Sequence, residues 1–407
     1  MIFAIAWRNI WRNKTRSIVV ILAIMIGLFG SLFIIALSNG VVEQKIDSAI
    51  NNEISHIQIH HQKFLQDKSI NYSIGSSAEK IDSIRKLEMV RSAAARLKTT
   101  AMASTAASAT GVTINGIDPD AEKELTRIHS ALVDGDYFER KSSTPLILVS
   151  KEFADELNAK TGSKVVVTIQ DTEGILTYGL FRVTGIYKTD NKVFDQQNVF
   201  VEKEDLAELI HTDPEKSTEI AVLLHKTDNT NVAAEKIRSM FPNLEVLTWK
   251  KIQPLLLGLS SMMEQFSVFL LVIILVALAF GIINTMLMAI LERTQELGML
   301  MAVGMNKRRV FIMIMLETVF LSLVGTIFGI AISAAVIEIT GMNGINFAAW
   351  AEGFESLGYS ALVYPTLYLS FYFLLTGMVL LTAILSSIYP ARKALKLDPA
   401  EAIREDA

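Results

Sequence analysis

The densest group of charged side chains at helical spacing lies in residues 291–310, which read LERTQELGMLMAVGMNKRRV. Glu292 and Glu296 are four residues apart with Arg293 beside them, so a helix would bring these charges together. Leucine and methionine side chains give the segment an apolar face for lipid, and its glycines limit the length of the helix. The charged face then suits contact with another protein. The other candidate contact residues are apolar or small: Leu297, Gly298, Ala302 and Gly304. The alternative structure for this segment is a solvated loop.

The chain carries no signature of an enzyme. It has no Gly-x-x-x-x-Gly-Lys-Ser/Thr phosphate loop, so it cannot bind ATP by that mechanism. It also lacks Gly-x-Ser-x-Gly and His-Glu-x-x-His motifs. Because it contains no cysteine, it has no disulfides, thiolate zinc sites or iron–sulfur clusters. We expect no catalytic residue, no cofactor and no metal site in this chain.

Three histidines near residue 60 could suggest a metal site. On a strand, His56 and His60 would share a face at a separation of about 13 Å, which is too far for one ion. His61 would point to the opposite face. We therefore expect these histidines to be exposed side chains of a strand.

Membrane-spanning helices are the elements that must position the charged segment. The 407 residues are 51% hydrophobic, and their mean hydropathy of +0.38 is too high for an ordinary soluble domain. A bilayer core of roughly 30 Å needs about 20 apolar residues in a helix. Such runs occur at residues 18–37, 264–290, 310–338 and 366–390. The net charge of −4 argues against a nucleic-acid partner.

The distribution of lysine and arginine predicts the topology. Of the short segments that flank the spans, 1–17, 291–309 and 391–407 contain lysine and arginine, whereas 339–365 contains neither. The positive-inside rule therefore assigns the first three segments, and both termini, to the cytoplasm. Residues 38–263 and 339–365 then lie outside. A cleaved signal peptide ending near Ala36-Leu37-Ser38 is the alternative, but the apolar run is longer than the usual roughly 7 to 15 residues.

Residues 1–17 are predicted to form an amphipathic helix at the membrane surface. Trp7 and Trp11 are four residues apart, as are Arg8 and Arg12. A helix would therefore carry adjacent aromatic and basic stripes that suit the lipid headgroup layer. A plain cytoplasmic extension of the first span is the alternative.

We expect Glu317 to be the only acid within the membrane. A carboxylate there costs roughly 2.5 to 3.5 kcal/mol on insertion scales, so it should face another helix or water. Either a structural hydrogen bond between spans or a direct role in transport or proton transfer would account for it. Gly325 and Gly329 in the same span form a Gly-x-x-x-Gly pattern, which permits close approach of two helices.

Residues 38–263 are predicted to form a mixed α/β domain with two subdomains. Strand patterns occur at 54–60, 164–170 and 181–187, and helical patterns at 151–159, 206–210 and 232–240. Residues 91–111 are small and polar and allow either strands or a flexible stretch, and residues 249–263 should extend the second span outward. The predicted fold is an α-helical membrane protein with four transmembrane helices and a large mixed α/β extracytoplasmic domain between helices 1 and 2.

The segment after the second span resembles the coupling-helix signature of FtsX-like permeases of ABC transporters, which typically read Glu-Arg-x-x-Glu-Ile/Leu-Gly-x-x-x-Ala-Leu/Val-Gly. The matching positions here are Glu292, Arg293, Glu296, Leu297, Gly298, Ala302, Val303 and Gly304. The tail YPARKALKLDPAEAIRE at 389–405 and the opening WRNIWRNKTRS at 7–17 are also similar to this family. Within the exported domain, residues 114–118 and 146–167 resemble more loosely the MacB-type and lipoprotein-releasing permeases. The order of span, large domain and three spans looks most like the lipoprotein-releasing permeases.

The resemblance implies a non-catalytic permease subunit in the bacterial inner membrane. Its partners would be two copies of a separate ATPase, which would bind ATP and Mg, and a second permease subunit, identical or different. In this family, ATPase closure moves the coupling helices, and the spans pass that motion outward without a substrate channel. The implied cargo is a lipoprotein drawn from the membrane. The alternatives are efflux of drugs or peptides and regulation of an envelope enzyme.

Overall fold

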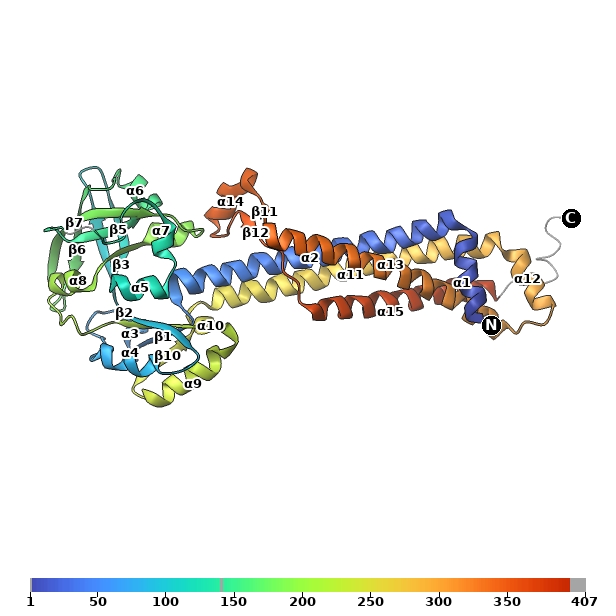
Figure 1. Ribbon diagram of the computed structural model, residues 1–407, viewed down its shortest axis with the longest axis horizontal. Coiled ribbons are helices and arrows are strands. Elements are labelled where there is room, and N and C mark those ends of the chain that lie inside the picture. The colour runs from blue at the N-terminus through green and yellow to red at the C-terminus, as the bar shows by residue number, and fades with distance from the viewer. Residues whose placement is uncertain (1, 140–141, 396–407) are drawn as a thin grey trace. The chain divides into compact units, whose positions relative to one another are not determined.

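The computed structural model describes residues 2–139 and 142–395, which fall into two compact units (Figure 1). The helical unit comprises residues 1–42, 260–346 and 362–407, and the α/β unit comprises residues 43–259 and 347–361. Most of the tail motif, from residue 396 onward, lies outside the described residues.

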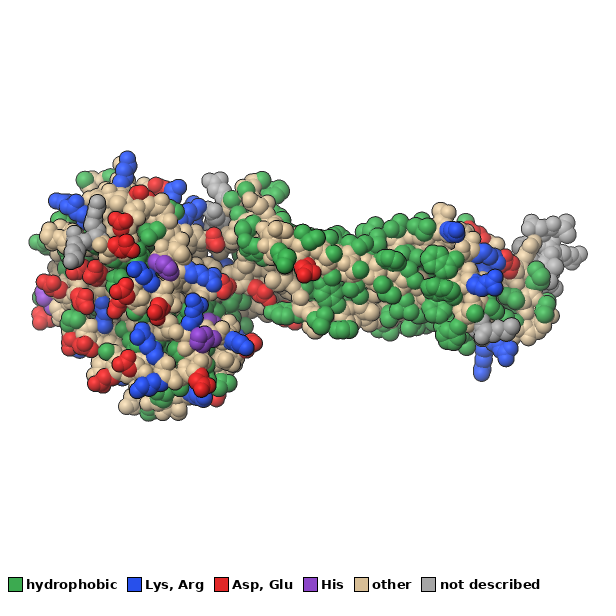
Figure 2. All heavy atoms as spheres, viewed as in Figure 1, with side chains coloured by type: hydrophobic (Ala, Val, Ile, Leu, Met, Phe, Trp, Pro, Cys, Tyr) green, Lys and Arg blue, Asp and Glu red, His purple; other side chains and the backbone are tan. Residues whose placement is uncertain are grey.

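Four long apolar helices dominate the described part of the helical unit, as the sequence predicts. They are α2 (Lys14–Ala49), α11 (Pro254–Glu292), α13 (Lys307–Asn343) and α15 (Leu369–Ala394), and each is long and apolar enough to cross a membrane. α1 (Ile2–Arg12) precedes α2, and α12 (Thr294–Ala302) follows α11. A short antiparallel pair joins β11 (Ile345–Asn346) and β12 (Leu362–Val363). Figure 2 shows hydrophobic side chains covering the long helices, whereas charged side chains gather over the α/β unit.

The long helices extend beyond the apolar runs. α2 continues to Ala49, α11 already begins at Pro254, and α13 ends at Asn343. Hydropathy identifies only the apolar stretch that fits the hydrocarbon core of a bilayer, whereas a helix continues as long as its backbone hydrogen bonds do. α13 contains Glu338 near its end as well as Glu317, and the expectation that Glu317 is the only acid within the membrane stays a prediction.

Small residues allow α13 to pack closely against α2. A Cβ atom at Gly325 would lie 2.9 Å from the Cβ of Ile24, and one at Gly329 would lie 3.1 Å from the Cβ of Leu28. Ile24 and Leu28 are both buried. The Gly-x-x-x-Gly pattern thus serves a helix contact within one chain, and larger side chains at either position would obstruct it.

The α/β unit contains a ten-stranded sheet in the order β10-β1-β9-β2-β3-β8-β5-β7-β4, with β6 pairing to both β2 and β7. Its strands are β1 (Ile57–His61), β2 (Val90–Ser104), β3 (Ala109–Ile117), β4 (Leu132–Gly135), β5 (Leu146–Ser150), β6 (Lys164–Gln170), β7 (Leu176–Tyr187), β8 (Asn198–Glu202), β9 (Glu219–Leu224) and β10 (Leu244–Thr248). Its helices are α3 (Phe64–Asp67), α4 (Ser77–Arg85), α5 (Pro119–Leu125), α6 (Lys151–Glu156), α7 (Lys192–Gln197), α8 (Lys203–Leu209), α9 (Thr230–Met240), α10 (Trp249–Ile252) and α14 (Ala351–Ser356).

The long strand β2 belongs to two hydrophobic cores. Its first half pairs with β9, where α4 and α9 cover one core, and its second half pairs with β3, where α6 and α8 contribute to another. Residues 91–111, for which the sequence allows strands or a flexible stretch, thus form most of β2 and the start of β3.

His60 of β1 and His56, which directly precedes β1, are buried, contrary to the sequence prediction, whereas His61 is only partly buried. His60 is 1% exposed, and its ring nitrogens lie 2.9 Å from the Thr218 carbonyl oxygen and 3.0 Å from Oε1 of Gln58. His56 is also buried, and its Nδ1 accepts a hydrogen bond from the Leu224 amide. Burial lowers the pKa of both histidines, that of His56 to about 4. The prediction was wrong because β1 is flanked by β9 and β10 and is not an exposed edge strand.

Candidate functional site

A break after α11 and a glycine turn after α12 set the predicted coupling helix apart from its neighbours. α11 ends at Glu292, and Arg293, with φ −120°, precedes α12. Beyond α12, Gly304 adopts φ +105°, a conformation that favours glycine. Asn306 then caps α13, and its Oδ1 accepts a hydrogen bond from the amide of Arg308 at 3.0 Å. The segment is therefore a short helix between two turns and not a solvated loop.

Ion pairs connect residues 292–296, where α11 ends and α12 begins, with α1, α2 and α13. Arg12 of α1 pairs with Glu296 of α12, and Nη1 of Arg16 in α2 lies 3.0 Å from Oε2 of Glu292. Arg293 joins two carboxylates, since its Nε lies 3.0 Å from Glu296 and its Nη1 lies 3.2 Å from Glu317 of α13. We call these six side chains the ion-pair cluster: Arg12, Arg16, Glu292, Arg293, Glu296 and Glu317.

The ion-pair cluster runs from the surface into the interior of the helical unit. The side chains of Arg12 and Glu296 are 54% and 41% exposed, whereas those of Arg293 and Glu317 are 13% and 5% exposed. Partial burial raises the pKa of Glu296, but hydrogen bonds from Arg12 and Arg293 outweigh it and hold that pKa below its usual value. A buried carboxylate needs a charged partner. The structure provides Glu317 with a hydrogen bond from Arg293 at the corner between α11 and α12.

The predicted contact residues in α12 and in the turn after it differ in burial. Leu297 and Gly298 are buried, whereas Ala302 and Gly304 are exposed. The apolar side chains of Met299 and Val303 are 57% and 86% exposed. Sequence reasoning did not single out Met299, although it is four residues before Val303 and so shares its face. The pairing of Arg16 was also not predicted. In the sequence Arg16 is one of several basic residues before the first span, and nothing distinguishes it from the others.

α1 packs on α13 and keeps its tryptophans partly exposed. Ile10 is fully buried, and the Trp7 ring meets the Phe320 ring edge-on, with centroids 5.8 Å apart. Trp7 is nonetheless 44% exposed and Trp11 is 43% exposed, and Arg8 is exposed as well. Partly exposed indoles beside basic side chains suit the headgroup layer of a bilayer.

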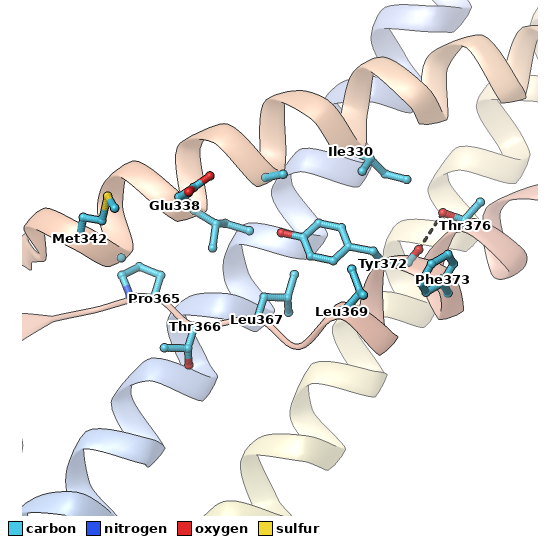
Figure 3. A pocket seen from close by; sticks show the side chains of 13 residues that line it. Ile330, Glu338, Met342, Pro365, Thr366, Leu367, Leu369, Tyr372, Phe373 and Thr376 are labelled. Atoms are coloured by element: carbon cyan, nitrogen blue, oxygen red, sulfur yellow. Dashed lines mark hydrogen bonds between the residues drawn. The ribbon is translucent and has the colours of Figure 1, made fainter.

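The helical unit also contains a groove between α13 and α15 (Figure 3). Its volume is about 710 Å³, and its lining is apolar apart from a few polar groups, which include the Glu338 carboxylate and the Tyr372 hydroxyl. Figure 3 shows Tyr372 between the two helices, with its carbonyl oxygen accepting a hydrogen bond from Thr376 at 2.7 Å. The sequence could not reveal this groove, since it forms where two distant segments approach each other.

Two family models match the chain. The model described as FtsX-like permease C-terminal matches residues 268–399, and the model described as MacB-like periplasmic core domain matches residues 17–240.

Relatives of low identity align over nearly the whole chain. The macrolide export ATP-binding/permease protein MacB of Neisseria gonorrhoeae is 23% identical over 425 residues, which cover 99% of this chain and 61% of that protein. The uncharacterized ABC transporter permease YknZ of Bacillus subtilis is 22% identical over 422 residues, which cover 98% of this chain and 97% of that protein. The chain thus spans about 61% of the length of this MacB relative. The solved extracellular domain of a YknZ transporter from Gram-positive bacteria aligns with 47% of this chain at 16% identity and a TM-score of 0.33.

Proposed function

Because the chain belongs to the FtsX-like permease family and carries a MacB-like periplasmic core domain, we propose that it passes ATPase-driven motion across the bacterial inner membrane to that domain. The chain is an ABC transporter permease. In this proposal α1, α12 and both termini face the cytoplasm, and the α/β unit faces the periplasm. Two copies of a separate ATPase bind ATP and Mg²⁺, and a second permease subunit completes the transporter.

The ion-pair cluster is the observation that supports this proposal. An ATPase surface that pushes on the exposed Met299 and Val303 displaces α12 as a body. Through Arg293, the displacement reaches the buried Glu317 and therefore α13. Close packing at Gly325 then couples α13 to α2. Packed elements of this kind pass a displacement on because they deform little.

Three of the four buried hydroxyl groups of α13 favour transmitted motion over a polar channel, whereas the fourth, that of Thr326, has no hydrogen-bond partner among the described residues. Thr318, Ser322 and Ser333 each donate a hydrogen bond to the carbonyl oxygen four residues earlier, at 3.2, 2.9 and 2.6 Å. Hydroxyl groups that are satisfied by their own helix offer little to a polar cargo. We infer that the cargo is handled on the periplasmic side of the membrane.

Export of a drug or peptide from the periplasm is our first candidate for the cargo. A relative that covers nearly the whole chain is named as a macrolide exporter, and the MacB-like domain occupies more than half of the chain. Lipoprotein extraction, the first expectation from the sequence, is the second candidate. It is supported by the open space beside Gly30 and by Phe266 and Phe269, which are 52% and 61% exposed and offer apolar room for acyl chains.

Reconstitution with a separate ABC ATPase whose hydrolysis this permease stimulates tests the coupling surface. Val303→Asp places a carboxylate on the exposed apolar face of α12 without altering the ion-pair cluster. We expect it to lower permease-stimulated ATP hydrolysis roughly tenfold, the equivalent of about 1.4 kcal/mol of contact energy. Val193→Asp, the same change at an exposed valine of the α/β unit, is the matched control. Full stimulation by the Val303 variant would contradict the proposed contact.

A photo-crosslinker at Phe266 separates the two candidate cargoes. Lipoprotein extraction predicts a lipoprotein adduct in the nucleotide-free complex that disappears on addition of ATP. Export predicts no such adduct and, instead, binding of added drug or peptide by the α/β unit.

A further inference from the structure

A basic cavity lies beside the ion-pair cluster, where the chain turns from α1 into α2. Its volume is about 550 Å³. Among the described residues, the lining contains four basic side chains, one acidic side chain and short polar residues: Asn9, Arg12, Asn13, Lys14, Thr15, Arg16, Glu292 and Arg293. The cavity is therefore polar and carries excess positive charge.

Part of this charge has no counterpart among the residues that the structure describes. Arg12, Arg16 and Arg293 pair with carboxylates of the ion-pair cluster. Lys14 is exposed and makes no ion pair or hydrogen bond within residues 2–139 and 142–395. The Nδ2 atom of Asn9 is buried and finds no acceptor among the same residues. The Lys14 ammonium group and the Asn9 amide thus remain for an acceptor that the described part of the chain does not supply.

We propose that this cavity binds the phosphate group of an anionic phospholipid. Arginine presents paired donors that fit phosphate oxygens, and lysine adds a point charge. The exposed indoles of Trp7 and Trp11 place α1 at the level of the headgroups, where lipid phosphate is abundant. The excess positive charge of the lining selects an anionic headgroup over a zwitterionic one.

The bound phosphate competes with a carboxylate of the chain. Glu292 lines the cavity, its side chain is 42% exposed, and it lies 3.0 Å from Arg16. A phosphate that engages Arg16 therefore displaces Glu292 toward solvent. Lipid binding would therefore change the ion pairing at the junction between α11 and α12.

Quenching of tryptophan fluorescence by brominated lipids tests the site on the full chain. The sequence contains four tryptophans, so Trp249→Phe and Trp350→Phe leave only the two indoles of α1. The protein is placed in phosphatidylcholine vesicles that contain either brominated phosphatidylglycerol or brominated phosphatidylcholine. We expect the phosphatidylglycerol to bind near α1 at least about fivefold more tightly, and Lys14→Gln to reduce that preference about fivefold.

Lys393→Gln is the matched control, because it removes another exposed lysine of the helical unit that does not line the cavity. It should leave the preference unchanged. Equal losses in the Lys14 and Lys393 variants would overturn the proposal, since they would indicate diffuse attraction to the surface. Loss of the preference on addition of inorganic phosphate at constant ionic strength would also overturn it, in favour of a site for free phosphate. No ATPase is present in this assay, so its outcome is independent of the coupling proposal.

Discussion

The two units of the molecule each contain a cluster of arginine and glutamate, but the surroundings of the two clusters differ. In the α/β unit, Arg96 of β2 lies between Glu122 of α5, at 2.6 Å, and Glu219 of β9, at 2.9 Å. All three side chains are at most 3% exposed. Arg96 also donates a hydrogen bond to the carbonyl oxygen of Glu53 at 2.8 Å. The ion-pair cluster of the helical unit, in contrast, reaches solvent at Arg12 and Glu296.

Burial makes the first cluster rigid and exposure makes the second changeable. Removing one partner of a buried ion pair strands the other charge and costs about 3–5 kcal/mol. An exposed ion pair contributes about 0–1 kcal/mol and can break and re-form readily. The Arg96 cluster therefore suits a domain that moves as one body, and the exposed part of the ion-pair cluster suits a segment that changes partners during an ATPase cycle.

The largest expected effect comes from the buried cluster. Arg96→Met leaves Glu122 without its ion partner and weakens the pairing of Glu219, so we expect a loss of about 3–5 kcal/mol in the free energy of unfolding. The measurement is denaturation of the full chain in detergent, followed by fluorescence of Trp249, which is buried in the α/β unit. Arg127→Met is the control, because Arg127 pairs with Asp47 at the surface. If both variants lose the same stability, the distinction between the clusters is wrong.

Protonation of Glu219 should make the free energy of unfolding depend on pH. Burial raises its pKa, but Lys98 and Arg96 outweigh burial and lower it to about 2 from an ordinary value of 4.5. The linked stability, about 3 kcal/mol, is therefore fully present above pH 4.5 and is lost as the pH falls toward 2. We expect the difference in unfolding free energy between the wild type and Glu219→Gln to narrow over that range. A difference that stays constant would refute this assignment.

A rigid contact of the helical unit should give the next largest effect. At Gly325, a Cβ atom would lie 2.9 Å from the Cβ of Ile24 and 3.2 Å from the carbonyl oxygen of Ile21. Gly325→Val should therefore cost about 1–3 kcal/mol through overpacking, seen as a lower melting temperature in detergent. Gly377→Val is the control, since a Cβ atom there meets nothing within 4 Å. Equal melting temperatures for the two variants would show that α2 and α13 separate without cost.

Local patterns in the sequence predicted the four apolar helices and the helical segment at 291–309, because hydropathy and charge spacing are local properties. The partners of the charges were not predictable in this way. Arg12 and Glu296 are 284 residues apart, and Arg96 and Glu219 are 123 residues apart. The burial of His60 likewise depends on strands far along the chain. These features depend on contacts between segments that are distant in the sequence, and a local residue pattern contains no information about such contacts.

Charge reversal at the exposed pair Arg12–Glu296 should change stability least but should change coupling to the ATPase strongly. It therefore tests directly whether this pair differs in role from the buried Arg96 cluster. Arg12→Glu and Glu296→Arg each place like charges side by side, so each should reduce permease-stimulated ATP hydrolysis several-fold and change stability by no more than about 1 kcal/mol. The double reversal restores an opposite-charge pair and should recover part of the stimulation, although Arg293 still faces the new charge at position 296. ATP hydrolysis in vesicles and melting in detergent are measured for all three variants. If the double reversal is as inactive as the single changes, Glu296 does not act through Arg12. Its carboxylate would then serve the ATPase directly, and the exposed part of the ion-pair cluster would be a binding surface and not a link between helices.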